Sequence, residues 1–109
     1  MKYLMTQEEF EQLIGRQPLP DDVVLPKVTV VYFTASWCGA CRRLNLPALE
    51  QAFPDINWLK CDIDQNNYTP GYCGVQSIPS FVLVKNMVPT TPFTSSKNEN
   101  VEAWIREQL

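Results

Sequence analysis

The strongest constraint on the fold lies in the first half of the chain, where an apolar run leads to a pair of cysteines. Val28–Phe33 is almost continuously apolar and rich in β-branched residues. This pattern is typical of a strand that is buried on both faces of a mixed or parallel sheet. Trp37, Cys38 and Cys41 follow. Residues at i and i+3 share one helix face, so a helix starting here brings the two thiols close enough to be bridged.

The same placement at a helix start suits the cysteine pair to thiol–disulfide exchange. The partial positive charge at a helix N-terminus stabilises a thiolate, and the thiolate is the nucleophile of dithiol–disulfide exchange. From Cys41 to Ala52, apolar residues recur at helical spacing. We therefore expect a helix after Cys38 that carries this stripe and is kinked at Pro47, with Cys38 exposed at its start and Cys41 buried.

Capping residues, turn residues and apolar runs outline the remaining elements. Strand, helix and strand in succession imply a parallel crossover, and a tight turn at Asn86 implies an antiparallel hairpin. The expected elements are an edge strand over Lys2–Met5, a helix from Thr6 to Gly15 with a Thr6/Glu9 capping box, a strand over Ile56–Ile63, a short helix between Thr69 and Gly74, strands over Ser80–Lys85 and Val88–Phe93, and a last helix capped by Ser96 and Glu99.

Length and charge limit the classes of protein. With 109 residues the chain is long enough for one core and too short for two, so we expect a single domain over residues 1–109. A net charge of −3 argues against nucleic acid or a membrane surface as the main partner. The N-terminus has no apolar signal region, so we expect a soluble, cytoplasmic monomer, although a mature domain trimmed of its signal would look the same.

The chain has no histidine, which excludes histidine-based catalysis and mixed Cys/His zinc sites. Its four cysteines are Cys38, Cys41, Cys61 and Cys73. An all-cysteine metal site is one alternative use, but Cys61 and Cys73 stand 12 residues apart and form no second knuckle. A purely structural Cys38–Cys41 bridge is another, although its minimal loop gains the least chain entropy. We expect no metal and no cofactor beyond a redox-active Cys38–Cys41 disulfide.

The order of elements and two short motifs resemble the thioredoxin family. The motifs are Trp37–Cys41 (WCGAC) after the first core strand and Ile78–Ser80 (IPS) before the hairpin. The similarity runs from about Val28 to the C-terminus and includes Lys60–Gln65. It implies an α/β thioredoxin fold with a central, mixed, four- to five-stranded sheet flanked by helices.

The resemblance also implies roles for particular residues. Cys38 would be the nucleophile that attacks a substrate disulfide, and Cys41 the resolving thiol that releases the substrate and leaves the bridge. Trp37 would shield the bridge. Pro79 corresponds to the family's cis-proline, and Ile78 before it would offer backbone hydrogen bonds to an extended substrate, so Trp37, Ile78 and Pro79 form the expected substrate-binding surface.

Two active-site positions depart from the family. Ala40, after Gly39, replaces a proline, so the turn gains an N–H and loses a fixed φ; we expect a somewhat more oxidising bridge. Tyr32 replaces a buried acid, and a phenol with a pKa of about 10 cannot accept the Cys41 proton at neutral pH. Resolution should then be slow unless Lys60 or a water carries the proton.

The implied function is that of a thiol–disulfide oxidoreductase in electron transport, most simply a protein disulfide reductase. Its partners would be disulfide-containing proteins and a thioredoxin reductase or another dithiol donor. A disulfide oxidase or isomerase is the alternative within the same chemistry, favoured by Ala40 and Tyr32. An adaptor subunit with incidental redox activity is the alternative from another class, and the intact cysteine pair argues against it.

Three other residues have two interpretations each. Arg42 and Arg43 form either a solvated surface or a charge that lowers the Cys38 pKa and favours acidic substrates. Cys73 is either a regulatory thiol or a small buried hydrophobe.

Overall fold

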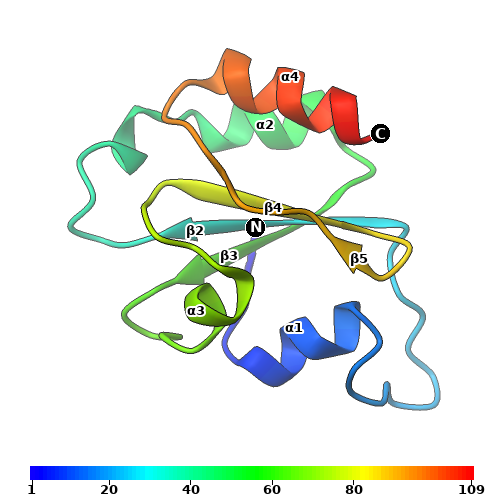
Figure 1. Cartoon of the computed structure of the whole chain (residues 1–109). Helices are drawn as coiled ribbons and strands as arrows, with labels where there is room; N and C mark the ends of the chain where they lie inside the picture. Colours follow the sequence, from blue (N-terminus) through cyan, green and yellow to red (C-terminus); the bar gives the residue numbers. More distant parts are fainter.

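The computed structural model describes residues 1–109 and shows a mixed sheet between two layers of helices (Figure 1). The helices α2 (Leu46–Ala52) and α4 (Asn98–Gln108) cover one face of the sheet. The helices α1 (Gln7–Leu13) and α3 (Thr69–Cys73) cover the other face. No helix is both long enough and apolar enough to span a bilayer.

The sheet has the order β1-β3-β2-β4-β5, and β6 pairs with β4. β2 runs parallel to β3 and antiparallel to β4, so the expected crossover and hairpin directions are confirmed. The strands are β1 (Lys2–Tyr3), β2 (Val28–Thr34), β3 (Asn57–Asp62), β4 (Ser80–Lys85), β5 (Val88–Pro89) and β6 (Phe93–Thr94).

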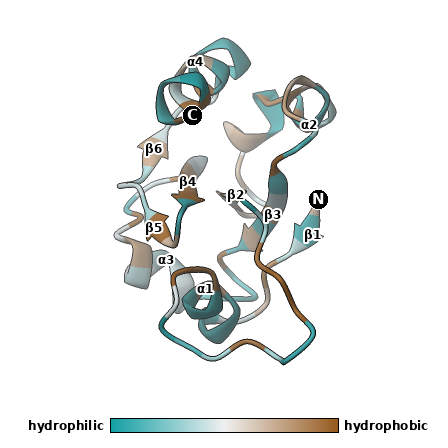
Figure 2. Cartoon of the chain, turned by 90° about the vertical axis from the view of Figure 1, so that its right-hand side faces the viewer, coloured by the Kyte–Doolittle hydropathy of each residue, from teal (hydrophilic) through white to brown (hydrophobic).

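β2 is the central strand, and both of its faces are buried. Val30 and Tyr32 belong to the apolar cluster under α2 and α4, whereas Val31 and Phe33 belong to the cluster over α1 and α3. This alternation explains why the sequence is apolar at nearly every position. Figure 2 shows hydrophobic residues on β4 beside it, while hydrophilic residues predominate on α4.

One row of side chains crosses the sheet on the face that α2 and α4 cover. The strand registers place Tyr3, Lys60, Tyr32, Phe81 and Phe93 side by side in that order. Tyr32 stacks on Phe81 with 5.1 Å between ring centroids. The row is apolar in its centre and carries one charged side chain, Lys60, between the two tyrosines.

The segment after the cysteine pair is not one helix. A 3-10 turn (η1) spans Cys41–Arg43, and Leu44 then adopts an extended conformation. The α-helix α2 begins at Leu46. The expectation of a single helix after Cys38 is therefore wrong, because the backbone leaves the helical region at Leu44.

Asn45 and Pro47 give the physical reason for the late start of α2. Asn45 Oδ1 accepts the backbone N–H of Ala48 at 3.1 Å, which caps the new helix. Pro47 lies in the first turn, where a backbone N–H has no partner within the helix. The expected kink at Pro47 is therefore also wrong: this proline helps to start a helix.

Asn98, the first residue of α4, is bonded to the cap of α2. Its Oδ1 accepts the N–H of Asn45 at 2.9 Å, and its Nδ2 donates to the Asn45 carbonyl at 2.9 Å. The expected capping box of Ser96 and Glu99 does not form, because the helix starts one residue later with Lys97 as its N-cap. Asn98 thus joins the two helices of this layer.

The hairpin after β4 also differs in part from expectation. Asn86 and Met87 have φ values of 54° and 62°, so they form the expected tight turn. The strand expected over Val88–Phe93 is split into β5 and β6, because Pro89 and Pro92 have no N–H for a continuous ladder. The sheet consequently has six strands.

Replacement of Asn98 by alanine removes both hydrogen bonds to Asn45. We expect the free energy of unfolding to fall by about 1–2 kcal/mol, because each bond contributes about 1 kcal/mol net. Urea unfolding of the oxidised protein measures the change. Asn98→Asp is the matched control, because it keeps the acceptor and loses the donor. Its free energy of unfolding should lie between those of the wild type and Asn98→Ala. Wild-type stability of Asn98→Ala would contradict this role.

Candidate active site

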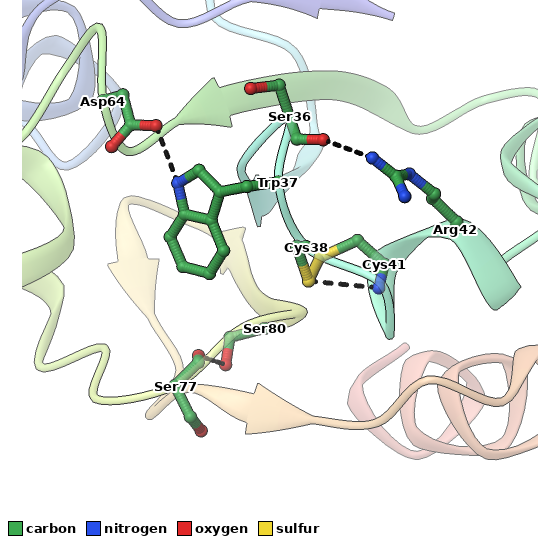
Figure 3. Close-up of a disulfide and its surroundings, with 8 residues drawn as sticks. All are labelled: Ser36, Trp37, Cys38, Cys41, Arg42, Asp64, Ser77 and Ser80. Carbon is green, nitrogen blue, oxygen red and sulfur yellow. Dashed lines mark hydrogen bonds between the residues drawn. A yellow bond between two sulfur atoms is a disulfide. The ribbon is translucent and has the colours of Figure 1, made fainter.

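The cysteine pair lies where β2 ends. The strand stops at Thr34, a turn follows, and Cys38 and Cys41 form a disulfide (Figure 3). β3 ends opposite Thr34 at Asp62, and β4 begins opposite the same end at Ser80. The bridge is therefore placed where the loop after β3 and the loop before β4 also arrive.

The turn that carries the bridge has its own hydrogen bonds. The N–H of Cys41 donates to Cys38 Sγ at 3.1 Å, and the N–H of Cys38 donates to the carbonyl of Ala35 at 3.1 Å. The guanidinium of Arg42 donates to the carbonyl of Ser36 at 2.9 Å (Figure 3). A hydrogen bond to sulfur favours its charged form. This single N–H takes the place of the α-helix terminus expected from the sequence.

Both cysteines are buried in the oxidised protein. The exposed fractions are 5% for Cys38 and 6% for Cys41. The expectation that Cys38 is exposed is therefore wrong; its side chain packs in the apolar cluster that includes Ala35 and Leu44. Trp37 is 62% exposed, and Ser36 and Gly39 beside it are exposed as well.

The indole of Trp37 is held by the loop after β3. Its Nε1 donates to Oδ2 of Asp64 at 2.9 Å (Figure 3). The N–H of Asp64 in turn donates to Oδ1 of Asp62 at 2.9 Å, which fixes the loop. Asp64 lies in the segment that resembles the family, but its contact with Trp37 was not predicted.

A groove of about 340 Å³ lies beside Trp37. Its walls come from the loop after β3, from α3 and from the segment before β4. The other lining residues are Ile63, Pro70, Val75, Gln76, Ser77 and Ile78. Of all these, the sequence singled out only Trp37 and Ile78.

The loop before β4 forms one wall of the groove. Its Ile78–Pro79 peptide bond is cis. Ser80 Oγ donates to the carbonyl of Ser77 at 2.6 Å (Figure 3). It shares a further hydrogen bond of 2.6 Å with Thr94 Oγ1. These contacts hold the segment that precedes β4 and were not predicted.

A second cavity, of about 270 Å³, lies on the α2 side of the bridge. Cys38 and Cys41 line it together with Tyr32, Lys60 and Arg42. Tyr32 and Lys60 are direct neighbours in the parallel register of β2 and β3, so the sheet brings both to the cysteine pair. None of the residues that line this cavity is an aspartate or a glutamate.

Tyr32 is fully buried behind the bridge. Burial raises the pKa of its phenol above the ordinary value, and a hydrogen bond with Thr34 offsets this only in part. The phenol therefore stays protonated at neutral pH. It cannot take the proton that Cys41 must lose before it attacks.

Cys61 and Cys73 lie outside the site. Cys61 belongs to the cluster over α1 and α3, on the face of the sheet away from Cys38 and Cys41, and Cys73 packs against that cluster. Burial raises the pKa of each of these two thiols to about 12. The four cysteines do not converge on one point, and Cys73 lacks the thiolate character that a regulatory thiol needs.

Comparison with known proteins agrees with this geometry. The family model for thioredoxin matches residues 3–107. The chain belongs to the thioredoxin family. Thioredoxin of Geodia cydonium is 32% identical, with 100% of this chain and 95% of the relative covered. Thioredoxin-1 of Schizosaccharomyces pombe is 34% identical, with 76% and 82% covered.

Solved structures of thioredoxins superpose closely on this thioredoxin-family chain. Oxidised mitochondrial thioredoxin 3 of Saccharomyces cerevisiae has a TM-score of 0.82 at 28% identity, with 98% of this chain and 94% of that chain covered. A yeast structure that concerns the thiol resolving mechanism in mitochondrial 1-Cys peroxiredoxin via glutathione/thioredoxin systems gives the same four values. The fold is the thioredoxin fold, and the protein is a thiol–disulfide oxidoreductase.

Most residues that the sequence assigned to this thioredoxin site lie together. Cys38, Cys41, Tyr32 and Lys60 line the second cavity, and Trp37 and Ile78 line the groove. The remaining assigned residues are Gly39 and Ala40 in the turn and Pro79 before β4. Asp64 was missed because Trp37, to which it is hydrogen-bonded, lies 27 residues away in the sequence.

Tyr32→Asp introduces the missing proton acceptor. We expect the resolving step to accelerate by about 10²-fold, the lower end of what a positioned general base contributes. Reduced protein mixed with an aromatic disulfide releases one thiolate when Cys38 attacks and a second when Cys41 resolves, so stopped-flow absorbance separates the steps. Tyr32→Phe, which removes only the hydroxyl, should leave the second rate unchanged. An unchanged second rate in Tyr32→Asp would refute the expectation.

Cys61 and Cys73 should resist alkylation in the folded, reduced protein. Their pKa values of about 12 lie above those of unfolded thiols, so both remain neutral up to about pH 9. Iodoacetamide at pH 8 followed by mass spectrometry should add one or two groups, all on Cys38 and Cys41, and four after denaturation. As the pH rises, Cys61 and Cys73 lose their protons in the unfolded state before they do so in the folded state. The free energy of unfolding should therefore also fall above about pH 9. Rapid labelling of folded Cys73 would contradict the prediction.

Proposed function

We propose that the protein is a small protein disulfide reductase, with Cys38 as its nucleophile and Cys41 as its resolving thiol. The observation that supports this most is the bridged pair beside an apolar groove that includes Trp37 and Ile78. Such a groove suits an extended segment of a protein substrate, and the adjacent dithiol suits exchange with its disulfide.

The reaction starts from the reduced protein. The Cys38 thiolate attacks one sulfur of the substrate disulfide; that S–S bond breaks, one substrate thiolate leaves, and a mixed disulfide forms on Cys38. Cys41 then loses its proton and attacks the Cys38 sulfur, which releases the second substrate thiolate. Two electrons have passed to the substrate, whose thiolates take up two protons, and the Cys38–Cys41 bridge has formed.

Trp37, Ile78 and Pro79 would position the substrate. The backbone groups of Ile78 make no hydrogen bond to other backbone groups of the protein, so they are free to pair with an extended peptide. Gly39 and Ala40 form the turn between the two thiols, and Tyr32 and Lys60 support the site from the sheet.

The partners follow from this cycle. Disulfide-containing proteins would oxidise the pair, and a thioredoxin reductase or another dithiol donor would reduce it again. The yeast structure that concerns a 1-Cys peroxiredoxin supports peroxiredoxins as one such class of partner. We further propose a cytoplasmic monomer that acts in electron transport without a metal or another cofactor, since exchange uses only the two thiols.

A disulfide oxidase or isomerase is the second candidate, favoured by Tyr32 and Ala40. Ala40 has a φ of −65°, the value that a proline would impose, so the turn has the same shape without the ring. Its N–H makes no hydrogen bond to the backbone and would stabilise the reduced, charged form of the cysteine pair. An adaptor role has no comparable support, because the cysteine pair is intact and bridged.

The reduction potential of the Cys38–Cys41 couple distinguishes these candidates. We expect a value somewhat more oxidising than the roughly −270 mV of thioredoxin, because Ala40 replaces proline. Trp37 fluorescence across a series of dithiothreitol redox buffers measures it. A value that stays near −270 mV supports a reductase, whereas about −180 mV or above assigns an oxidase or isomerase. A potential at or below the thioredoxin value would refute the expected effect of Ala40.

Two sets of variants serve as controls for this experiment. Ala40→Pro keeps φ and removes the N–H, so it should lower the potential without loss of fold. Cys38→Ser should abolish turnover of a protein disulfide such as insulin, and Cys41→Ser should trap the mixed disulfide. Full turnover by Cys38→Ser would overturn the proposed function.

A further inference from the structure

The segment before β4, which forms one wall of the groove beside Trp37, is held in place by few hydrogen bonds. No backbone group of residues 76–79 bonds to another backbone group. The side chain of Ile78 packs against both apolar clusters, but this packing leaves the direction of its backbone groups open. The hydrogen bonds that do reach this segment come from two side chains, those of Ser80 and Thr94.

Three side chains, those of Ser77, Ser80 and Thr94, form a closed cycle of hydrogen bonds that we call the hydroxyl cycle. Ser80 Oγ donates to the carbonyl of Ser77 at 2.6 Å (Figure 3). Ser80 Oγ and Thr94 Oγ1 lie 2.6 Å apart, and Thr94 Oγ1 and Ser77 Oγ lie 3.5 Å apart. The cycle therefore reaches Ser77 twice, at its carbonyl and at its hydroxyl.

The number of available protons fixes the direction of these bonds. A hydroxyl group has one proton to donate. Ser80 uses its proton for the carbonyl of Ser77, so Thr94 must be the donor in the bond to Ser80 Oγ. Ser77 is then the donor in the longer contact with Thr94 Oγ1. All three bonds point the same way around the cycle, an arrangement in which each bond polarises the next.

Thr94 is itself well anchored and lies outside the groove. It belongs to β6 and is paired with Ser80 in the antiparallel ladder with β4. The next residue, Ser95, accepts hydrogen bonds of 3.2 Å from the N–H of Lys97 and from Nδ2 of Asn100, at the start of α4. Ser80, the link between Thr94 and the groove, is only 1% exposed. Thr94 therefore acts on the groove from behind its wall.

We propose that Thr94 is a positioning residue for protein substrates. Its hydroxyl, acting through Ser80, sets the direction in which the backbone groups around Ile78 face an extended substrate. Thr94 lines neither the groove nor the cavity beside the bridge, so the electrons and protons move as in the exchange above. The inference rests on the proposed function, because it takes the segment at Ile78 as the place where a protein substrate docks.

Thr94→Val keeps the shape of the side chain and removes its hydroxyl. We expect kcat/KM for the reduction of insulin to fall by about threefold to tenfold, the range that one hydrogen bond contributes. The loss should come mainly from a higher KM, because binding is weakened and the chemical step is not. Initial rates at several insulin concentrations, with dithiothreitol as the electron donor, measure both constants. The rate with a small aromatic disulfide, which does not need the groove, should change much less.

Three variants serve as controls. Thr94→Ser keeps the hydroxyl and should restore the wild-type KM. Thr91→Val makes the same substitution at an exposed residue of the same loop that lies outside the hydroxyl cycle, and it should behave as wild type. Ser80→Ala removes the link itself. Addition of Thr94→Val to Ser80→Ala should raise KM little further, because both residues act through one cycle.

The outcomes distinguish this inference from the proposed function. An unchanged KM for insulin in Thr94→Val, or an equal loss with insulin and with the small disulfide, would overturn the inference alone. Thr94→Ala repeats the test if Thr94→Val does not fold. Wild-type protein that reduces the small disulfide but no protein disulfide would instead overturn the proposed function. The carbonyl chemical shift of Ser77 in the Thr94 variants would then still report whether Thr94 acts on this segment.

Discussion

The position of β2 is the constraint on which the rest of the structure depends. The strand is hydrogen-bonded on both edges, to β3 in parallel and to β4 antiparallel, and it is buried on both faces. Because side chains alternate along a strand, a slip of one residue would turn Tyr32 away from the bridge and bring Val31 toward it. The register with β3 also decides that Lys60 reaches the site. The chemistry of the cysteine pair is thus set by the packing of one strand.

Tyr32 links the interior of the protein to that chemistry. As a neutral aromatic side chain it stacks on Phe81 and extends the apolar row across the sheet. A buried carboxylate at the same place would have to be paired or protonated. With a phenol there instead, no carboxylate lines the cavity beside the bridge, and its charged lining residues are Arg42 and Lys60. The residue at this one core position therefore decides whether a carboxylate lies beside the bridge.

The sequence predicted those parts of the fold that depend on local patterns. Three features could be predicted because each is determined by neighbouring residues: the strand β2, the Thr6 cap of α1 and the turn at Asn86. The break at Leu44 was not, since the apolar spacing continues through it. The role of Asn98 was hidden because its partner Asn45 lies 53 residues away. The burial of Cys38 likewise depends on packing against distant residues.

The link between Asn45 and Asn98 has a consequence for how the protein changes with oxidation state. It anchors the chain just beyond η1, while the hydrogen bond from Cys38 to Ala35 anchors it just before the bridge. The bridge itself closes a loop of sequence separation 3, so cleaving it frees little chain entropy. Neither anchor uses a sulfur atom, so cleavage of the bridge by itself breaks neither of them. The equilibrium between the dithiol and the disulfide of Cys38 and Cys41 is then governed mainly by bond enthalpy and charge at the two sulfur atoms, and little by the conformational entropy of the backbone.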